Sequence, residues 1–93
     1  MVRVHVFISG RVQGVCFRAC ARRWAAESGL KGWVRNLYDG RVELAAEGDR
    51  PAVEALIERL KVGPPRAHVD GVEILFENPR EEDDDFRVRP TDY

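Results

Sequence analysis

The 93-residue chain is poor in the residues that mark several classes of protein. Its two cysteines and two histidines are too few and too scattered for a zinc-ligand pattern. Because Cys16 and Cys20 are only four residues apart, a disulfide between them would tie together almost nothing. The sequence therefore favours reduced cysteines, as in the cytoplasm, and predicts no metal site.

An excess of positive charge and long apolar runs are also missing. The formal net charge is −1, whereas a nucleic-acid-binding domain normally carries a strong basic excess. No apolar run approaches the roughly 18 residues of a membrane span, and strand-like alternation begins where a signal peptide would have its apolar core. We expect one globular cytoplasmic domain over residues 1–93, with no nucleic-acid or membrane partner.

Hydrophobic periodicity predicts an α+β fold with the element order β-α-β-β-α-β. Apolar residues alternate in the strands and recur at helical spacing in the helices, and an Asp-Gly pair at 39–40 predicts a hairpin. The order is typical of the ferredoxin-like sandwich, an antiparallel sheet with both helices on one face. The predicted elements are strands at 2–9, 31–37, 41–47 and 69–76, helices at 17–28 and between Asp49 and Gly63, and a segment at 86–89 that is either a fifth strand or a continuation of the fourth strand's edge.

The stretch Gly10 to Arg18 is the most informative part of the chain. Its glycines lie in a turn between a strand and a helix, where backbone N–H groups can surround a small anion beside the helix N-terminus. Arg18 adds a forked cation that fits phosphate oxygens, although it could instead be a surface arginine paired with an acid. Gln13 could donate to the ligand or brace the turn. Arg11 could be a second cation, but the sequence favours a solvated loop residue.

Asn36 is the second candidate, because the predicted topology brings the end of the 31–37 strand to the same sheet edge as the Gly10–Arg18 turn. A neutral amide could hold an attacking water beside a phosphate without repelling it. The alternative is an asparagine near a turn that hydrogen-bonds its own backbone. With no acid–base pair nearby, an acyl phosphate is a fitting substrate, since its carboxylate leaving group departs without a proton.

Other chemistry-bearing residues have simpler interpretations. Cys16 precedes Arg18 by only two positions, whereas cysteine-dependent phosphatases close a longer loop resembling Cys-x5-Arg, so we interpret Cys16 as a structural residue. His5 and His68 are expected at the surface without partners. The acidic run at 81–85 is expected to be a solvated loop, with a metal site as a weaker alternative, and both tryptophans are expected to pack rather than to stack on a ligand.

Two motifs resemble the signatures of the acylphosphatase family, and the resemblance covers essentially the whole chain. Residues 10–18, GRVQGVCFR, resemble its phosphate-loop signature G-[RK]-V-Q-G-V-x-[FY]-R. Residues 32–43, GWVRNLYDGRVE, resemble its second signature G-x-V-x-N-x-x-D-G-x-V-E. The tail at 90–93 and the acidic run depart from the family pattern, and Cys16 fills a variable position where an oxidisable thiol could affect activity.

The resemblance implies a ferredoxin-like hydrolase that cleaves the carboxyl–phosphate bond of small acyl phosphates. It also implies that no metal or organic cofactor is needed and that inorganic phosphate is the other partner. Arg18 corresponds to the family's phosphate-binding arginine and Asn36 to its water-orienting asparagine. The phosphate-binding loop corresponds to Val12, Gln13, Gly14, Val15, Cys16 and Phe17. Nothing in the sequence suggests an obligate oligomer, so we expect a monomer.

Two other function classes share this element order. An RNA-recognition module needs stacking aromatics on its central strands, and the 41–47 strand has none. A non-catalytic or accessory copy of the fold, such as the domain that opens larger hydrogenase-maturation carbamoyltransferases, is disfavoured by the presence of both Arg18 and Asn36 and by the short chain. The sequence therefore favours an enzyme.

Overall fold

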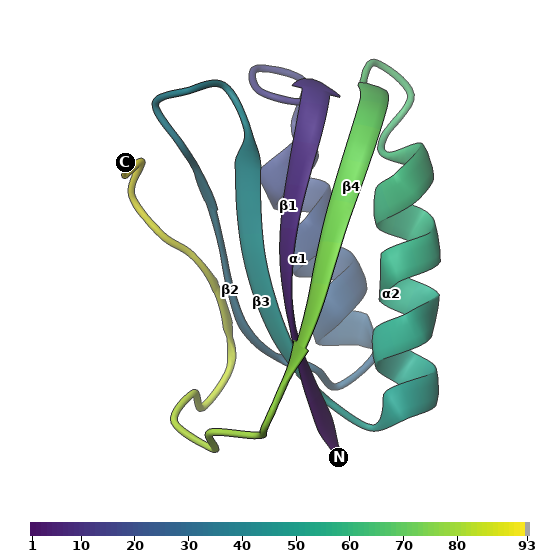
Figure 1. Ribbon diagram of the computed structural model, residues 1–93, viewed down its shortest axis with the longest axis vertical. Coiled ribbons are helices and arrows are strands. Elements are labelled where there is room, and N and C mark those ends of the chain that lie inside the picture. The colour runs from purple at the N-terminus through teal and green to yellow at the C-terminus, as the bar shows by residue number, and fades with distance from the viewer. Residues whose placement is uncertain (93) are drawn as a thin grey trace.

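The computed structural model describes residues 1–92 and has two layers, a sheet and a pair of helices that cover one of its faces (Figure 1). The five strands lie in the order β4-β1-β3-β2-β5. Tyr93, the last residue of the tail, lies outside the described residues. The elements are β1 (Val2–Arg11), α1 (Phe17–Glu27), β2 (Lys31–Asn36), β3 (Val42–Gly48), α2 (Arg50–Val62), β4 (His68–Glu77) and β5 (Phe86–Val88).

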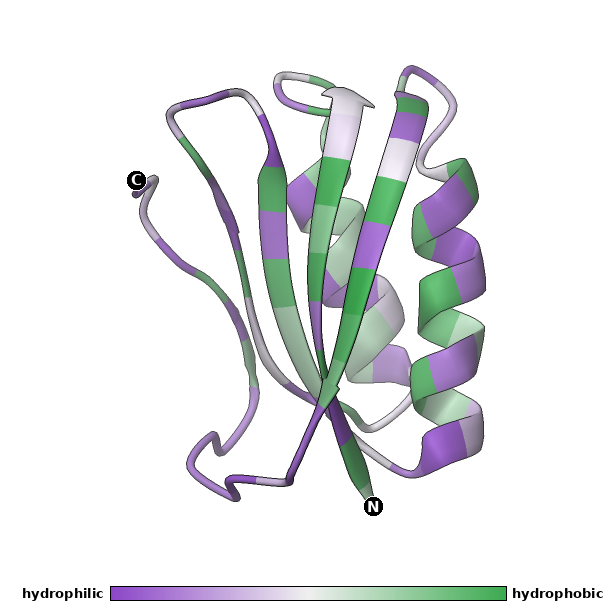
Figure 2. Ribbon diagram, viewed as in Figure 1, coloured by the Kyte–Doolittle hydropathy of each residue, from purple (hydrophilic) through white to green (hydrophobic). Residues whose placement is uncertain are grey.

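The core lies between the sheet and the helices because alternate strand residues point to the same side. Strand β1 contributes a fully buried row of aliphatic residues, and β3 adds a second row beside it. Helix α2 buries residues spaced as one helical face, and the hydropathy colouring shows the resulting alternation along strands and helices (Figure 2). The rows comprise Val4, Val6 and Ile8 of β1, Val42, Leu44 and Ala46 of β3, and Val53, Leu56, Ile57 and Leu60 of α2.

The predicted ferredoxin-like α+β class is confirmed, and the element bounds agree with the predictions to within two residues. One feature of the sheet was not predicted: it is mixed rather than wholly antiparallel. Strand β5 pairs in parallel with β2, with Gly32 opposite Phe86 and Val34 opposite Val88. The segment at 86–89 therefore does not continue the β4 edge. The chain crosses to the opposite edge of the sheet, where Phe86 is buried in the core.

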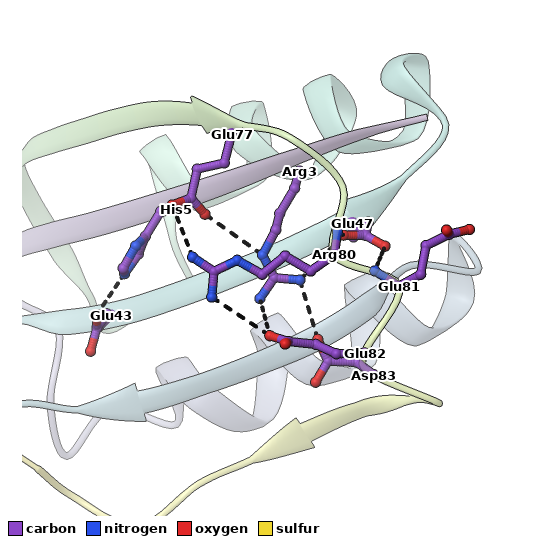
Figure 3. Close-up of polar contacts among 9 residues, drawn as sticks. All are labelled: Arg3, His5, Glu43, Glu47, Glu77, Arg80, Glu81, Glu82 and Asp83. Atoms are coloured by element: carbon purple, nitrogen blue, oxygen red, sulfur yellow. Dashed lines mark hydrogen bonds and ion pairs between the residues drawn. The ribbon is translucent and has the colours of Figure 1, made fainter.

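A cluster of charged residues on the helix-free face fixes this crossing (Figure 3). Arg3 on β1 is only 2% exposed, and its Nη1 lies 3.3 Å from Glu47 Oε1 and 3.2 Å from Asp83 Oδ2. Glu77 and Glu82 approach the same guanidinium at 3.6 and 3.7 Å. The prediction that residues 81–85 form a solvated loop was therefore wrong for Asp83, which is half-buried against a cation that is distant in sequence. Glu82 approaches the same cation but stays exposed, as predicted.

The Glu47 carboxylate also binds backbone N–H groups of the segment that crosses from β4 to β5. Its Oε1 accepts the N–H of Arg80 at 2.7 Å, and its Oε2 accepts the N–H of Glu81 at 3.0 Å. Burial by itself would raise the pKa of Glu47, but these two N–H donors and the Arg3 guanidinium outweigh it, so the pKa is lowered.

Both histidines have acidic partners, contrary to the prediction. His5 is half-buried, with Nε2 2.6 Å from Glu43 Oε2, and its ring stacks on Phe7. His68 is at the surface as predicted, but its Nε2 lies 3.1 Å from Asp70 Oδ1. His5 pairs across strands β1 and β3 and His68 pairs within β4, and neither histidine lines the pocket described below.

We expect Glu47→Gln to lower the free energy of unfolding at pH 7 by about 1–3 kcal/mol, because it weakens a buried, charge-assisted network. Since the folded pKa lies below the unfolded one, this stabilisation is complete above about pH 4.3 and is lost as the pH falls through the folded pKa. Urea unfolding at pH 7 and pH 3 measures it, and the difference between the two proteins should be smaller at the lower pH. Glu54→Gln is the control, because Glu54 is exposed on α2. An equal difference at both pH values would contradict the role of the Glu47 charge.

Candidate active site

The loop between β1 and α1 meets the end of β2 around a pocket of about 230 Å³. Its walls include Arg18 from the first turn of α1 and Asn36 from the last position of β2, so their predicted convergence is confirmed. The full lining is Val12, Gly14, Cys16, Phe17, Arg18, Ala19, Asn36 and Val88.

The loop backbone is curved by left-handed residues at alternate positions. Gly14 has φ 73°, and Cys16, which precedes α1, has φ 62° and ψ 23°. Such alternation turns successive N–H groups toward a common centre, which makes a concave site for an anion. A non-glycine residue in this conformation is uncommon and is maintained by the surrounding structure. The role of Cys16 in shaping the loop was not predicted, since sequence reasoning considered only its thiol.

Side chains of the loop anchor it on both sides. Val12, Val15 and Phe17 are buried in the core, so only their backbone groups are available to a ligand. The Gln13 amide Nε2 donates to the carbonyl oxygens of Leu37 at 2.7 Å and Arg41 at 2.9 Å. Of the two roles considered for the Gln13 side chain, it therefore braces the turn, joining the loop to the β2–β3 hairpin.

Arg18 is half-buried and makes no ion pair with any carboxylate in residues 1–92. The alternative that it is a surface arginine paired with an acid was therefore wrong. A half-buried guanidinium at a helix N-terminus creates a positive potential that an anion can neutralise. Arg11 is exposed and is not part of the pocket lining, which agrees with its interpretation as a solvated residue and not with a second cation at this site.

Asn36 is held by its backbone, which pairs with Val42 of β3. Its Oδ1 is buried and has no hydrogen-bond partner in the part of the chain that the structure describes. The alternative of an asparagine bonded to its own backbone was therefore wrong. Rotating the carboxamide by a half-turn exchanges donor and acceptor, so this side chain has an unused hydrogen-bonding group at the pocket wall.

Sequence reasoning missed two lining residues, Ala19 and Val88. Ala19 follows Arg18 in the first turn of α1, and its helical position could have suggested it. Val88 comes from β5, and no local pattern shows which sheet edge this strand joins. Both add apolar side chains to the pocket lining.

The other features that could carry a function are the two cysteines, clusters of metal-binding side chains, apolar helices and the two tryptophans. Cys16 and Cys20 are free thiols, the first exposed and the second half-buried. Within residues 1–92, no group of three or more histidine, cysteine or acidic side chains is arranged to hold a metal ion. No helix in these residues is long and apolar enough to span a membrane. Trp24 packs against the core as predicted, and Trp33 lies beneath the guanidinium groups of Arg35 and Arg89.

Comparison with known proteins identifies the family. The acylphosphatase family profile matches residues 4–88. The chain belongs to the acylphosphatase family. It is 52% identical over 88 residues to an acylphosphatase of Roseiflexus sp., with 95% of each chain covered.

Solved structures agree with this membership. The acylphosphatase from Bacillus subtilis superposes with a TM-score of 0.92 at 35% identity, covering 96% of this chain and 99% of that one. Full-length HypF contains a similar region, with a TM-score of 0.87 at 29% identity. The match covers 98% of this chain but only 12% of HypF, so the acylphosphatase fold also occurs within a much larger protein.

Proposed function

We propose that this acylphosphatase hydrolyses small acyl phosphates to a carboxylate and orthophosphate, with Arg18 and the loop backbone binding the phosphate and Asn36 orienting the attacking water. The observation that carries the assignment is that, in the described part of the chain, one pocket is lined both by an arginine without a carboxylate partner and by an asparagine with an unpaired buried oxygen. Arg18 has no carboxylate partner among residues 1–92, and the Asn36 carboxamide has an unpaired oxygen.

Phosphate binding follows from the shape and charge of the loop. The left-handed residues Gly14 and Cys16 support an inward arrangement of the N–H groups of residues 12–17, and α1 adds the positive end of its dipole. Arg18 supplies two N–H donors in a planar fork, which fits two phosphate oxygens. A pocket of about 230 Å³ is large enough for a phosphoryl group and a small acyl group.

The reaction requires few other groups. A water held by the Asn36 carboxamide forms a bond to phosphorus as the bond from phosphorus to the acyl oxygen breaks. The leaving carboxylate needs no proton, and the proton of the attacking water passes to a phosphate oxygen. Charge that develops on the phosphoryl oxygens is stabilised by Arg18 and the N–H groups, which is the main requirement of phosphoryl transfer.

The lining of the pocket is consistent with this chemistry. It contains no carboxylate and no imidazole, so no general base is placed beside the reacting phosphorus. It also has no anionic group that would repel a phosphate dianion. The apolar side chains of Ala19 and Val88 provide a wall against which the acyl group can lie.

We further propose that the chain works as a monomeric single domain in the cytoplasm. Arg18, Asn36 and the phosphate loop line one pocket within a single copy of the chain, as a monomeric enzyme requires. One continuous core cluster connects both helices to the sheet, which supports a single domain over residues 1–93. Two free thiols, one at the pocket, suit a reducing compartment.

We expect Arg18→Ala to lower kcat/KM for benzoyl phosphate by about 10³-fold and to weaken inhibition by inorganic phosphate at least about tenfold, because the forked cation is lost. Steady-state kinetics in excess EDTA, with phosphate as competitor, measures both effects. Arg22→Ala is the control, since Arg22 lies one turn further along α1, is exposed and is outside the pocket. Unchanged phosphate inhibition in a folded Arg18→Ala protein would contradict the binding assignment.

We expect Asn36→Ala to lower kcat by about 10²- to 10³-fold while the inhibition constant of phosphate changes less than about threefold, because the amide acts on the water rather than on the phosphate. Asn36→Asp should also lose phosphate affinity through charge repulsion. The exposed Asn78 provides the control variant Asn78→Ala. Hydrolysis near the wild-type rate would show that Asn36 does not orient the water.

A further inference from the structure

The tail after β5 runs back along β2 and contacts the segment that carries Asn36. The N–H of Arg89 donates to the Val34 carbonyl at 2.8 Å. Further along, the N–H of Asp92 donates to the Asn36 carbonyl at 3.1 Å, and the Asp92 carbonyl accepts the N–H of Tyr38 at 2.9 Å. Asp92 is thus hydrogen-bonded to the backbone on both sides of Leu37, with which it forms a parallel β-bridge.

A series of ion pairs connects the Asp92 side chain to the sheet. Its Oδ2 lies 3.0 Å from Nη1 of Arg35, the residue before Asn36. The Nε of Arg35 donates to Glu43 Oε1 at 2.6 Å, and Glu43 Oε2 lies 2.6 Å from His5 Nε2. Figure 3 shows the last of these contacts, between Glu43 and His5. Through Arg35, the tail is connected to strands β2, β3 and β1.

This anchoring matters because the Asn36 side chain has little to orient it. Its Oδ1 has no hydrogen-bond partner among residues 1–92, so its position depends on the backbone to which it is attached. That backbone is fixed by β3 on one side and by Asp92 on the other. Gln13 fixes the next residue, Leu37, from the phosphate loop.

We propose that Asp92, through its ion pair with Arg35 and its backbone contacts, is a positioning residue that places the Asn36 carboxamide for its role in turnover. This inference rests on the proposed function. Asp92 itself is not part of the pocket lining, so it acts through Asn36 and not on the substrate. The tail at 90–92 is then part of the catalytic apparatus, although it lies outside both sequence motifs.

The test is a double-mutant cycle with Asp92→Asn, which removes the charge and keeps the N–H donor. We expect kcat for benzoyl phosphate to fall about three- to tenfold, with KM and phosphate inhibition within about twofold, because misplacing a catalytic group by a fraction of an ångström lowers turnover. In an Asn36→Ala background, the same substitution should leave kcat unchanged, since the group that it positions is gone. Asp85→Asn is the matched control, because it breaks an exposed ion pair with Arg87 near the start of β5.

A second readout separates this inference from the reaction itself. Nuclear magnetic resonance should show the Asn36 side-chain amide signals shifted and the Tyr38 amide exchanging faster in Asp92→Asn but not in Asp85→Asn. Wild-type protein without turnover would refute the proposed function, and the signals alone would then decide on the positioning role. Unchanged Asn36 signals, an unchanged kcat, or an equal loss of kcat in the Asn36→Ala background would overturn it.

Discussion

Two hydrogen bonds from one side chain connect the two halves of the candidate active site directly. Gln13 lies in the loop before α1, and its amide nitrogen donates to two carbonyl oxygens of the β2–β3 hairpin. These bonds connect the loop that can bind an anion to the strand end that carries Asn36. Buried Val12, Val15 and Phe17 anchor the loop in the core, and the Gln13 bonds add a direct polar connection between the loop and the hairpin that carries Asn36.

The two most important arginines differ in how their charges are balanced. Arg3 is almost fully buried and is surrounded by four carboxylates, as a buried cation requires. Arg18 is partly buried, yet it has no carboxylate partner among residues 1–92. Arg3 therefore stabilises the fold, because its positive charge is balanced by carboxylates of the protein itself. The positive charge of Arg18 is available to a ligand, which is the physical basis of an anion site in a chain with a net charge of −1.

Much of the fold could be predicted from sequence because it depends on local patterns. Alternation and helical spacing located the elements, and the order of those elements brought Asn36 to the same sheet edge as the Gly10–Arg18 turn. The edge joined by β5 could not be predicted, since three residues carry too little periodicity to show it. The partners of Arg3 and His5 were also missed, because these contacts join positions 38 to 80 residues apart.

The candidate site was predicted in its residues but not in its detailed geometry. The motifs indicated Arg18, Asn36 and the loop at 12–17, whereas the left-handed Cys16 and the unpaired Asn36 oxygen depend on how the loop and hairpin pack. The bracing role of Gln13 could not be separated from ligand binding until its two acceptors were known. The tail gave no local signal, because its contacts with β2 follow from the sheet edge that β5 joins.

The most direct measurement is a titration of isotopically labelled wild-type protein with inorganic phosphate, followed by nuclear magnetic resonance. If Arg18 and the loop form the anion site, the backbone amides of residues 12–17 and the Arg18 guanidinium should shift together with one saturating dissociation constant. Added salt should weaken this binding. Shifts centred on the exposed arginines of α1, or no shift in the loop amides at saturating phosphate, would contradict the account.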